Sequence, residues 1–122
     1  MEKTIHIFKE NYQQLPNRFI RKLEADIQYI LNTDLQELKC VYLFGSCARG
    51  EVRSSSDIDL LILTEDKIKD RERAADIRWT LSEPLEGVKT DIVYMNEKTQ
   101  NENTVFKNQV NKDKKLILEV RK

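Results

Sequence analysis

The sequence predicts an α/β domain in which a small mixed β-sheet is flanked by helices. Three short apolar runs, at residues 40–44, 57–63 and 88–95, have the length and the content of branched side chains typical of buried strands. A helical pattern precedes the first run, and another separates the second run from the third. Strands that alternate with helices in this way are typical of a sheet covered by helices.

Two stretches of helical spacing come before the first predicted strand. From Pro16 to Leu31 the apolar side chains form one face of an amphipathic helix, with the proline in its first turn. That face consists of Phe19, Ile20, Leu23, Ile27, Ile30 and Leu31. Residues 5–15 also carry helical spacing, at Ile5, Phe8, Tyr12 and Leu15. We interpret the chain as one domain, residues 1–122, with residues 1–15 as an N-terminal extension.

The second half of the chain contains further predicted elements. Residues 64–81 predict a helix whose inward face holds Ile68, Ala75, Trp79 and Leu81. For Trp79 we expect a place in the core, with a partner-facing position as the alternative. Pro84 and Gly87 mark the turn that follows. Residues 97–111 are polar and predict a helix anchored by Val105, Phe106 and Val110, and residues 116–120 predict a last strand or the end of a helix.

Composition and charge exclude some classes of protein. The 122 residues suffice for one hydrophobic core but not for a catalytic domain with a separate lid. Lys plus Arg and Asp plus Glu both number 21, so the net charge gives no support to broad nucleic-acid binding. No apolar run approaches the roughly 20 residues that cross a bilayer. Two cysteines and no recognisable export signal favour a reducing cytoplasm.

Three acidic side chains lie on two of the predicted strands. Asp57 and Asp59 stand at the start of the second strand, and residues two apart on a strand point to the same face. Two carboxylates on an apolar strand repel each other and are costly to bury, and a divalent cation removes both penalties. Asp91, in the third strand, would complete the group. Three carboxylates suit two Mg²⁺ ions, or Mn²⁺, about 3.5–4 Å apart.

A glycine and a serine directly follow the first predicted strand. Gly45 permits a ligand to approach the backbone closely, and Ser46 with the N–H groups of a starting helix forms an anion site. We expect the triphosphate of a bound nucleotide to rest there. Each of these features alone is common in structural turns and surface strands. Their joint order along the chain is what indicates a function.

The same residues carry a family resemblance. The stretch Leu43-Phe-Gly-Ser-Cys-Ala-Arg-Gly-Glu51, followed by Ser56-Asp-Ile-Asp-Leu-Leu-Ile62, resembles the signature of the polymerase-β-like nucleotidyltransferase superfamily. In detail it is similar to the minimal nucleotidyltransferases, whose pattern is Gly-Ser, ten residues, then Asp-x-Asp. Here ten residues separate Ser46 from Asp57. The order of predicted elements resembles that fold from about residue 16 to residue 120.

The resemblance implies a role for each residue of the signature. Gly45 and Ser46 would contact the triphosphate of ATP or another nucleoside triphosphate. Asp57 and Asp59 would hold the metal ions. Asp91 matches the third carboxylate of the family, which binds metal and activates the attacking hydroxyl. For Arg49 two roles stay open, a contact with phosphate and a salt bridge to an acid such as Glu51.

The resemblance also implies a partner. Minimal nucleotidyltransferases are often encoded beside an α-helical HEPN protein in toxin–antitoxin pairs, where they act as antitoxins. They can transfer AMP from ATP to a tyrosine of the toxin. That context is an analogy with the family rather than a property of these residues.

Two other functions stay open. The fold could serve as a non-catalytic antitoxin that neutralises its partner by contact alone, although clustered unused carboxylates would then only reduce stability. Alternatively, the acceptor of the nucleotide could be a small molecule such as an aminoglycoside. Enzymes of that kind carry an additional substrate domain, so a homodimer would have to build the missing surface.

Overall fold

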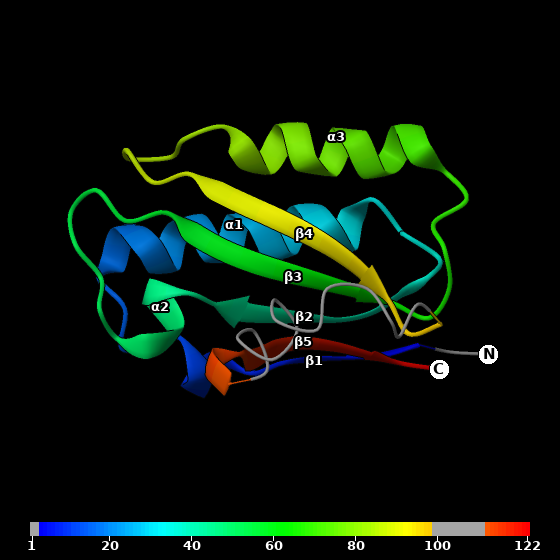
Figure 1. Cartoon of the computed structure of the whole chain (residues 1–122), viewed down its shortest axis with the longest axis horizontal. Helices are drawn as coiled ribbons and strands as arrows, with labels where there is room; N and C mark the ends of the chain where they lie inside the picture. The colour runs from blue at the N-terminus through cyan, green and yellow to red at the C-terminus, as the bar shows by residue number, and fades with distance from the viewer. Residues whose placement is uncertain (1–2, 99–111) are drawn as a thin grey trace.

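The computed structural model describes residues 3–98 and 112–122 as five strands with helices on one side. The sheet has the order β1-β5-β2-β3-β4 (Figure 1). Its strands are β1 (Thr4–Ile7), β2 (Leu38–Phe44), β3 (Ile58–Thr64), β4 (Thr90–Asn96) and β5 (Lys115–Arg121). β3 and β4 run parallel, and the other neighbours are antiparallel. The mixed sheet predicted from the sequence is confirmed.

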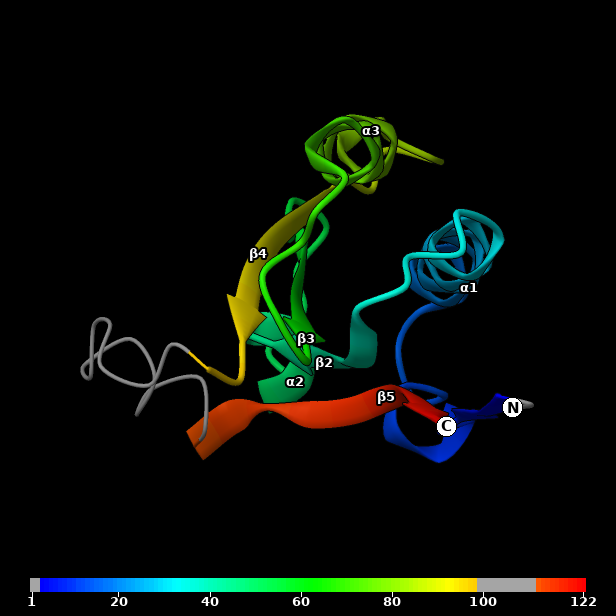
Figure 2. The same ribbon diagram turned by 90° about the vertical axis from the view of Figure 1, so that its right-hand side faces the viewer.

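Two long helices cover one side of this sheet. They are α1 (Asn17–Asn32) and α3 (Arg71–Ser82), and Figure 2 shows both on the same side of the curved sheet. The short helix α2 (Ser46–Arg49) follows β2 directly, and the 3₁₀ turn η1 (Lys9–Asn11) follows β1. No helix in the described ranges is long and apolar enough to cross a membrane.

The core lies between the sheet and the two long helices. Alternate residues of β3 face it, so that Ile58, Leu60 and Ile62 have no exposed surface. The predicted face of α1 supplies buried side chains to the same cluster, namely Phe19, Leu23, Ile27 and Ile30. Residues of β3 and β4 that alternate with the core positions therefore point to the opposite face of the sheet.

The N-terminal segment differs from the prediction. Residues 4–7 form the edge strand β1, which pairs with β5 from Thr4↔Arg121 to Ile7↔Leu118. The helical spacing predicted for residues 5–15 was wrong, because the free edge of β5 offers backbone hydrogen bonds that the local pattern does not reveal. Residues 4–7 thus add a strand to the sheet.

Helix α3 also begins later and turns a different face inward. Residues 58–64 belong to β3, and the helix starts at Arg71, where the Asp70 side chain accepts a hydrogen bond from the backbone N–H of Arg73 (3.0 Å).

The buried residues of α3 are Ile77 and Leu81. The expected inward positions at Ala75 and Trp79 were wrong, since Ala75 is exposed and Trp79 is 73% exposed. Positions 75/79 and 77/81 have the same i, i+4 spacing, so the pattern alone could not choose between them.

The C-terminal predictions have mixed outcomes. The last segment is a strand, β5, which lies between β1 and β2. Of the helix predicted at residues 97–111, residues 97–98 form a turn, and residues 99–111 lie outside the described part of the chain. The predicted anchors Val105, Phe106 and Val110 lie in that undescribed range.

A buried ion pair links α1 to the beginning of β4. The Lys22 ammonium donates to the Asp26 carboxylate (2.5 Å), to the Leu81 carbonyl at the end of α3 (2.9 Å) and to the Thr90 hydroxyl (3.0 Å). The Thr90 hydroxyl in turn donates to Asp26. Lys22 and Asp26 are 2% and 4% exposed. Burial raises the pKa of the Asp26 carboxyl, and the hydrogen bonds from Lys22 and Thr90 oppose that rise. Three elements are thus fixed by one charged pair.

Removal of one partner should be far more harmful than removal of both. We expect Lys22→Met to lower the free energy of unfolding by about 3–5 kcal/mol, because it leaves the Asp26 carboxylate buried without a counter-ion. The double variant Lys22→Met/Asp26→Leu should recover most of that loss. Urea unfolding at neutral pH measures both. A cost below about 1 kcal/mol for the single variant, as for an exposed pair, would contradict this account.

Candidate active site

The site is built around two aspartates on adjacent parallel strands. In the register of β3 and β4, Asp59 lies beside Asp91, while their neighbours Ile58 and Thr90 point into the core at 0% and 1% exposure. Asp59 and Asp91 therefore share the face of the sheet opposite the long helices. Asp59 is half-buried and Asp91 is exposed. The register brings these two predicted site residues together.

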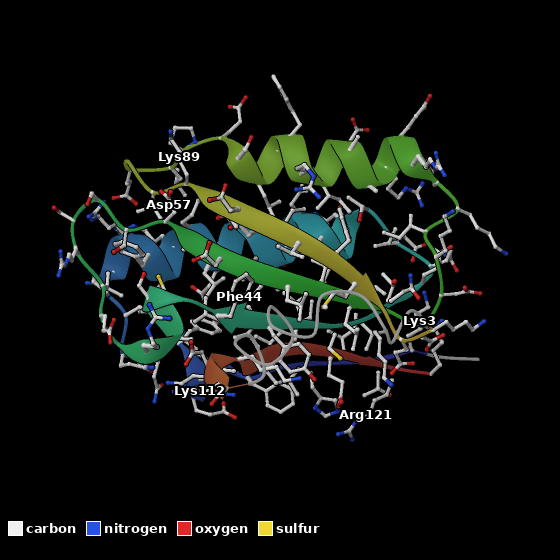
Figure 3. The ribbon with its side chains drawn as sticks, viewed as in Figure 1. Lys3, Phe44, Asp57, Lys89, Lys112 and Arg121 are labelled. Atoms are coloured by element: carbon white, nitrogen blue, oxygen red, sulfur yellow. The ribbon has the colours of Figure 1, made fainter. Side chains whose placement is uncertain are left out.

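Asp57 reaches the site from the loop that leads into β3. It directly precedes the first residue of β3 and is exposed, so its predicted place within the strand was one residue off. The backbone N–H of Ile58 donates to the carbonyl of Lys89 (2.9 Å), which ties the beginnings of the two strands together. Figure 3 shows Asp57 and Lys89 close to each other at this end of the sheet. Lys89 places an exposed cation at this corner that the sequence analysis missed.

The charges of Asp91 and Asp57 act on the half-buried Asp59 carboxyl. Burial, the charge of Asp91 and the charge of Asp57 together raise the pKa of the Asp59 carboxyl to about 6. The Arg49 guanidinium opposes this rise. The negative charges therefore lie near enough to resist ionisation of the central one, which is the situation that a bound cation relieves.

Gly45 lies against the central carboxylate. It follows Phe44, the β2 residue that pairs with Asp59, and Figure 3 labels Phe44 near the end of β2. Its backbone has φ 73° and ψ −155°, and a Cβ at this position would overlap the Asp59 carboxylate. A side chain is thus excluded twice, by the positive φ and by the lack of space. The sequence predicted that a ligand could come close to the backbone at Gly45. In this structure the Asp59 carboxylate lies there.

Helix α2 follows Gly45 and fixes the loop before β3. The thiol of the buried Cys47 donates to the Asp57 carbonyl at 3.5 Å. Burial and the charges of Asp59 and Asp57 raise the pKa of this thiol to about 11, so it stays protonated and able to donate. Ser46 is half-buried and hydrogen-bonds with Cys47. The sequence analysis gave Cys47 no role, because its contact with Asp57 depends on how the turn folds.

Arg49 forms ion pairs on the surface of the site. Its guanidinium contacts Glu51 (3.3 Å) and Asp113 (3.0 Å). The salt bridge to Glu51, one of its two predicted roles, is therefore present. A contact with phosphate stays a prediction for Arg49.

The side chains of this site offer the type of donor atom that a magnesium ion prefers. Asp57, Asp59 and Asp91 offer only carboxylate oxygens, which are the ligands that Mg²⁺ prefers. Within residues 3–98 and 112–122, however, no three His, Cys, Asp or Glu side chains are placed to hold a metal ion together. To hold a metal ion together, the three carboxylates would have to come closer than they lie in this structure.

Comparison with known proteins identifies the family. A family model described as polymerase beta nucleotidyltransferase matches residues 25–122. The chain belongs to this nucleotidyltransferase family. The match covers the turn, all three aspartates and every strand except β1, which lies outside it. A comparison with curated proteins found no match.

Solved structures of nucleotidyltransferases have the same fold. A proposed nucleotidyltransferase from Sulfolobus solfataricus is 21% identical, with a TM-score of 0.56 over 82% of this chain and 79% of that one. A toxin–antitoxin complex with AMP-PNP has a chain that is 26% identical, with a TM-score of 0.54 over 76% of this chain and 70% of its own length. A mutant of the pair MntA–HpeT is also 26% identical, with a TM-score of 0.53 over 77% and 70% of the two chains.

The raised pKa of Asp59 predicts that the stability of the metal-free protein depends on pH. In the unfolded chain its pKa is near 3.8 and in the fold about 6, so the folded state binds the proton more tightly and stability falls as pH rises through this window. In metal-free protein, Asp59→Asn should therefore raise the melting temperature at about pH 7.5 and change it little at about pH 4. Asp76→Asn, an exposed acid on α3, is the control. Equal stability of wild type and Asp59→Asn at both pH values would contradict the electrostatic account.

Proposed function

We propose that this chain is a magnesium-dependent nucleotidyltransferase that transfers AMP from ATP to a hydroxyl of a partner protein. One observation carries the proposal: Asp59 lies beside Asp91 on parallel strands, with the Gly45-Ser46 turn packed against the Asp59 carboxylate. Membership of the nucleotidyltransferase family supports the type of reaction.

Each residue of the site has a proposed task in this reaction. Asp57, Asp59 and Asp91 would hold two Mg²⁺ ions, which when bound neutralise the charge on the phosphates and on the attacking and leaving oxygens. Gly45 and Ser46 would bind the triphosphate through backbone N–H groups and the serine hydroxyl. Arg49 would exchange one of its two carboxylate partners for a phosphate oxygen.

The bond changes follow from this arrangement. The acceptor oxygen forms a bond to the α-phosphorus of ATP, and the bond from that phosphorus to the oxygen bridging the β-phosphate breaks. Pyrophosphate leaves, and the acceptor proton passes to the Asp91 carboxylate and then to water. The reaction depends mainly on alignment and neutralisation of charge. The fixed carboxylates would position the cations, and the cations would neutralise the charge on the phosphates.

The proposed partner is a HEPN-type toxin. The resemblance of the motif to the minimal nucleotidyltransferases suggests it, and two structural neighbours at 26% identity come from toxin–antitoxin complexes, one of them with AMP-PNP. Both described cysteines are buried free thiols, which agrees with the proposed cytoplasmic setting.

A transfer assay tests the proposal. The purified HEPN-type protein encoded beside this chain, with ATP and Mg²⁺, should gain one or more adenylate masses by intact-mass spectrometry. Asp59→Asn should slow the transfer at least about 100-fold, because a ligand of the charge-neutralising metal ions is lost. Asp91→Asn should do the same.

Two controls separate this proposal from its alternatives. Asp76→Asn, which removes an exposed acid on α3, should transfer at the wild-type rate. If wild type adds no mass and the Asp57→Asn/Asp59→Asn variant neutralises the partner equally well, the chain is a binding antitoxin. If only an aminoglycoside accepts the nucleotide, the acceptor is a small molecule.

A further inference from the structure

The strand β1 forms an edge of the sheet whose outer side is unpaired within residues 3–98 and 112–122. Figure 1 shows β1 beyond β5, at the end of the sheet opposite β4. The backbone N–H of Phe8 donates to the Ile117 carbonyl of the antiparallel strand β5 (2.9 Å), and bonding residues alternate along such a pair. The backbone groups of His6 therefore also face β5, and those of Ile5 and Ile7 point outward.

The side chains of these two isoleucines extend the apolar face of the sheet. Ile5 and Ile7 lie opposite Val120 and Leu118 of β5, which belong to the core, so they point to the same face as α1. Their exposed fractions are nonetheless 48% and 47%. Beside Ile7, a hollow of about 360 Å³ lies between β1 and α1, and Ile27 forms part of its wall. The apolar face thus continues past the point where α1 covers it.

The opposite edge of the sheet is protected, whereas β1 is not. Along β4, the Arg78 guanidinium donates to the Ile92 carbonyl (2.9 Å), and Asp91 places an exposed charge on the strand. Charges, prolines and bulges are the usual protection of an edge strand against pairing. β1 has the sequence Thr-Ile-His-Ile, with no Lys, Asp, Glu or Pro, and its register with β5 has no shift. Its outer side is therefore suited to pair with another strand.

We propose that β1 pairs antiparallel with β1 of a second copy of this chain, so that one sheet runs through a two-fold symmetric dimer. Backbone hydrogen bonds must join residues whose groups point outward. The two-fold register that uses both isoleucines places Ile5 opposite Ile7 of the second copy, and His6 opposite His6 of the second copy, on the axis. Four isoleucines then lie side by side on the face of α1, where each strand covers apolar surface of the other.

The charges at the two ends of β1 suit a second copy. Lys3 lies 3.6 Å from Asp34 at one end, and Lys9 lies 3.7 Å from Glu24 at the other. An antiparallel two-fold places the first end of one copy beside the second end of the other. Each end of the interface then holds two cations and two anions. The edge is thus complementary to itself in charge as well as in hydrogen bonds.

Pairing of this kind stops at two copies. Each chain offers β1 as an open edge, while the edge at β4 carries Asp91 and has its Ile92 carbonyl occupied by Arg78. A two-fold contact between equal edges closes on itself instead of forming a fibre. Asp59 and Asp91 lie on β3 and β4, which β5 and β2 separate from β1. The dimer contact therefore does not involve the proposed active site.

Sedimentation equilibrium over a concentration series tests the proposal. The measured mass should approach twice the monomer mass as the protein concentration rises toward about 1 mM, where a Kd of that order still populates the dimer. Ile5→Lys should raise the dimer Kd at least about 10-fold, because a charge replaces an apolar side chain that the second copy covers. Leu85→Lys, at a 41% exposed apolar position away from β1, is the matched control and should dimerise as wild type does. Far-UV circular dichroism checks that both variants are folded.

A charge swap tests the position of the two-fold axis. His6 is exposed, so its replacement leaves the core intact. His6→Lys and His6→Glu each set like charges opposite each other, and each variant alone should be monomeric at concentrations at which wild type is half dimeric. An equimolar mixture of the two should dimerise, because unlike charges then face each other.

Hydrogen exchange followed by NMR reports the contact residue by residue. The amides of Ile5 and Ile7 should gain protection as the protein concentration rises. The amides of His6 and Phe8, which face β5, should be protected at every concentration.

Three results would overturn the proposal. One is a chain that stays monomeric at every concentration, and another is Ile5→Lys that dimerises as tightly as wild type. The third is protection of the Ile5 and Ile7 amides only when the HEPN-type protein is added, which would assign the edge to that partner. A failure of nucleotide transfer leaves the dimer standing, since none of these measurements uses ATP or a metal ion.

Discussion

The parallel pairing of β3 with β4 is the constraint on which the rest of this structure depends. It places Asp59 beside Asp91, and burial together with the repulsion from Asp91 and Asp57 raises the pKa of Asp59 to about 6. Gly45 must then lack a side chain, because the Asp59 carboxylate fills the space of its Cβ. A sheet selected only for stability would not gather these charges, and their presence at one end is understood if a cation offsets them.

On the core face of the sheet, the buried pair Lys22–Asp26 fixes the beginning of β4. Through the Thr90 hydroxyl this pair holds the residue next to Asp91, and through the Leu81 carbonyl it holds the end of α3. The two faces of β4 therefore differ: the Lys22–Asp26 pair contacts Thr90 on one face, and the Asp91 carboxylate lies on the other.

The sequence predicted the elements whose pattern is local and strong. The face of α1, the buried runs of β2 and β3 and the Gly45-Ser46 turn before Asp57 all follow from spacing. It could not predict β1, because residues 4–7 become a strand only when the edge of β5 is available. Nor could it orient α3, since Ala75/Trp79 and Ile77/Leu81 have the same spacing and only packing against the sheet chooses between them. The roles of Cys47 and of the Lys22–Asp26 pair depend on contacts between distant segments, which no motif encodes.

Metal binding by the three carboxylates is the central claim, and the number of bound Mn²⁺ ions tests it most directly. Electron paramagnetic resonance of free Mn²⁺, with a non-hydrolysable ATP analogue present, gives the bound number per chain. Because three carboxylates and a triphosphate suit a pair of ions, the account predicts two bound ions in wild type and a loss of both in Asp59→Asn. Binding that is equal in wild type and Asp59→Asn would mean that the nucleotide alone holds the metal, and the account would be contradicted.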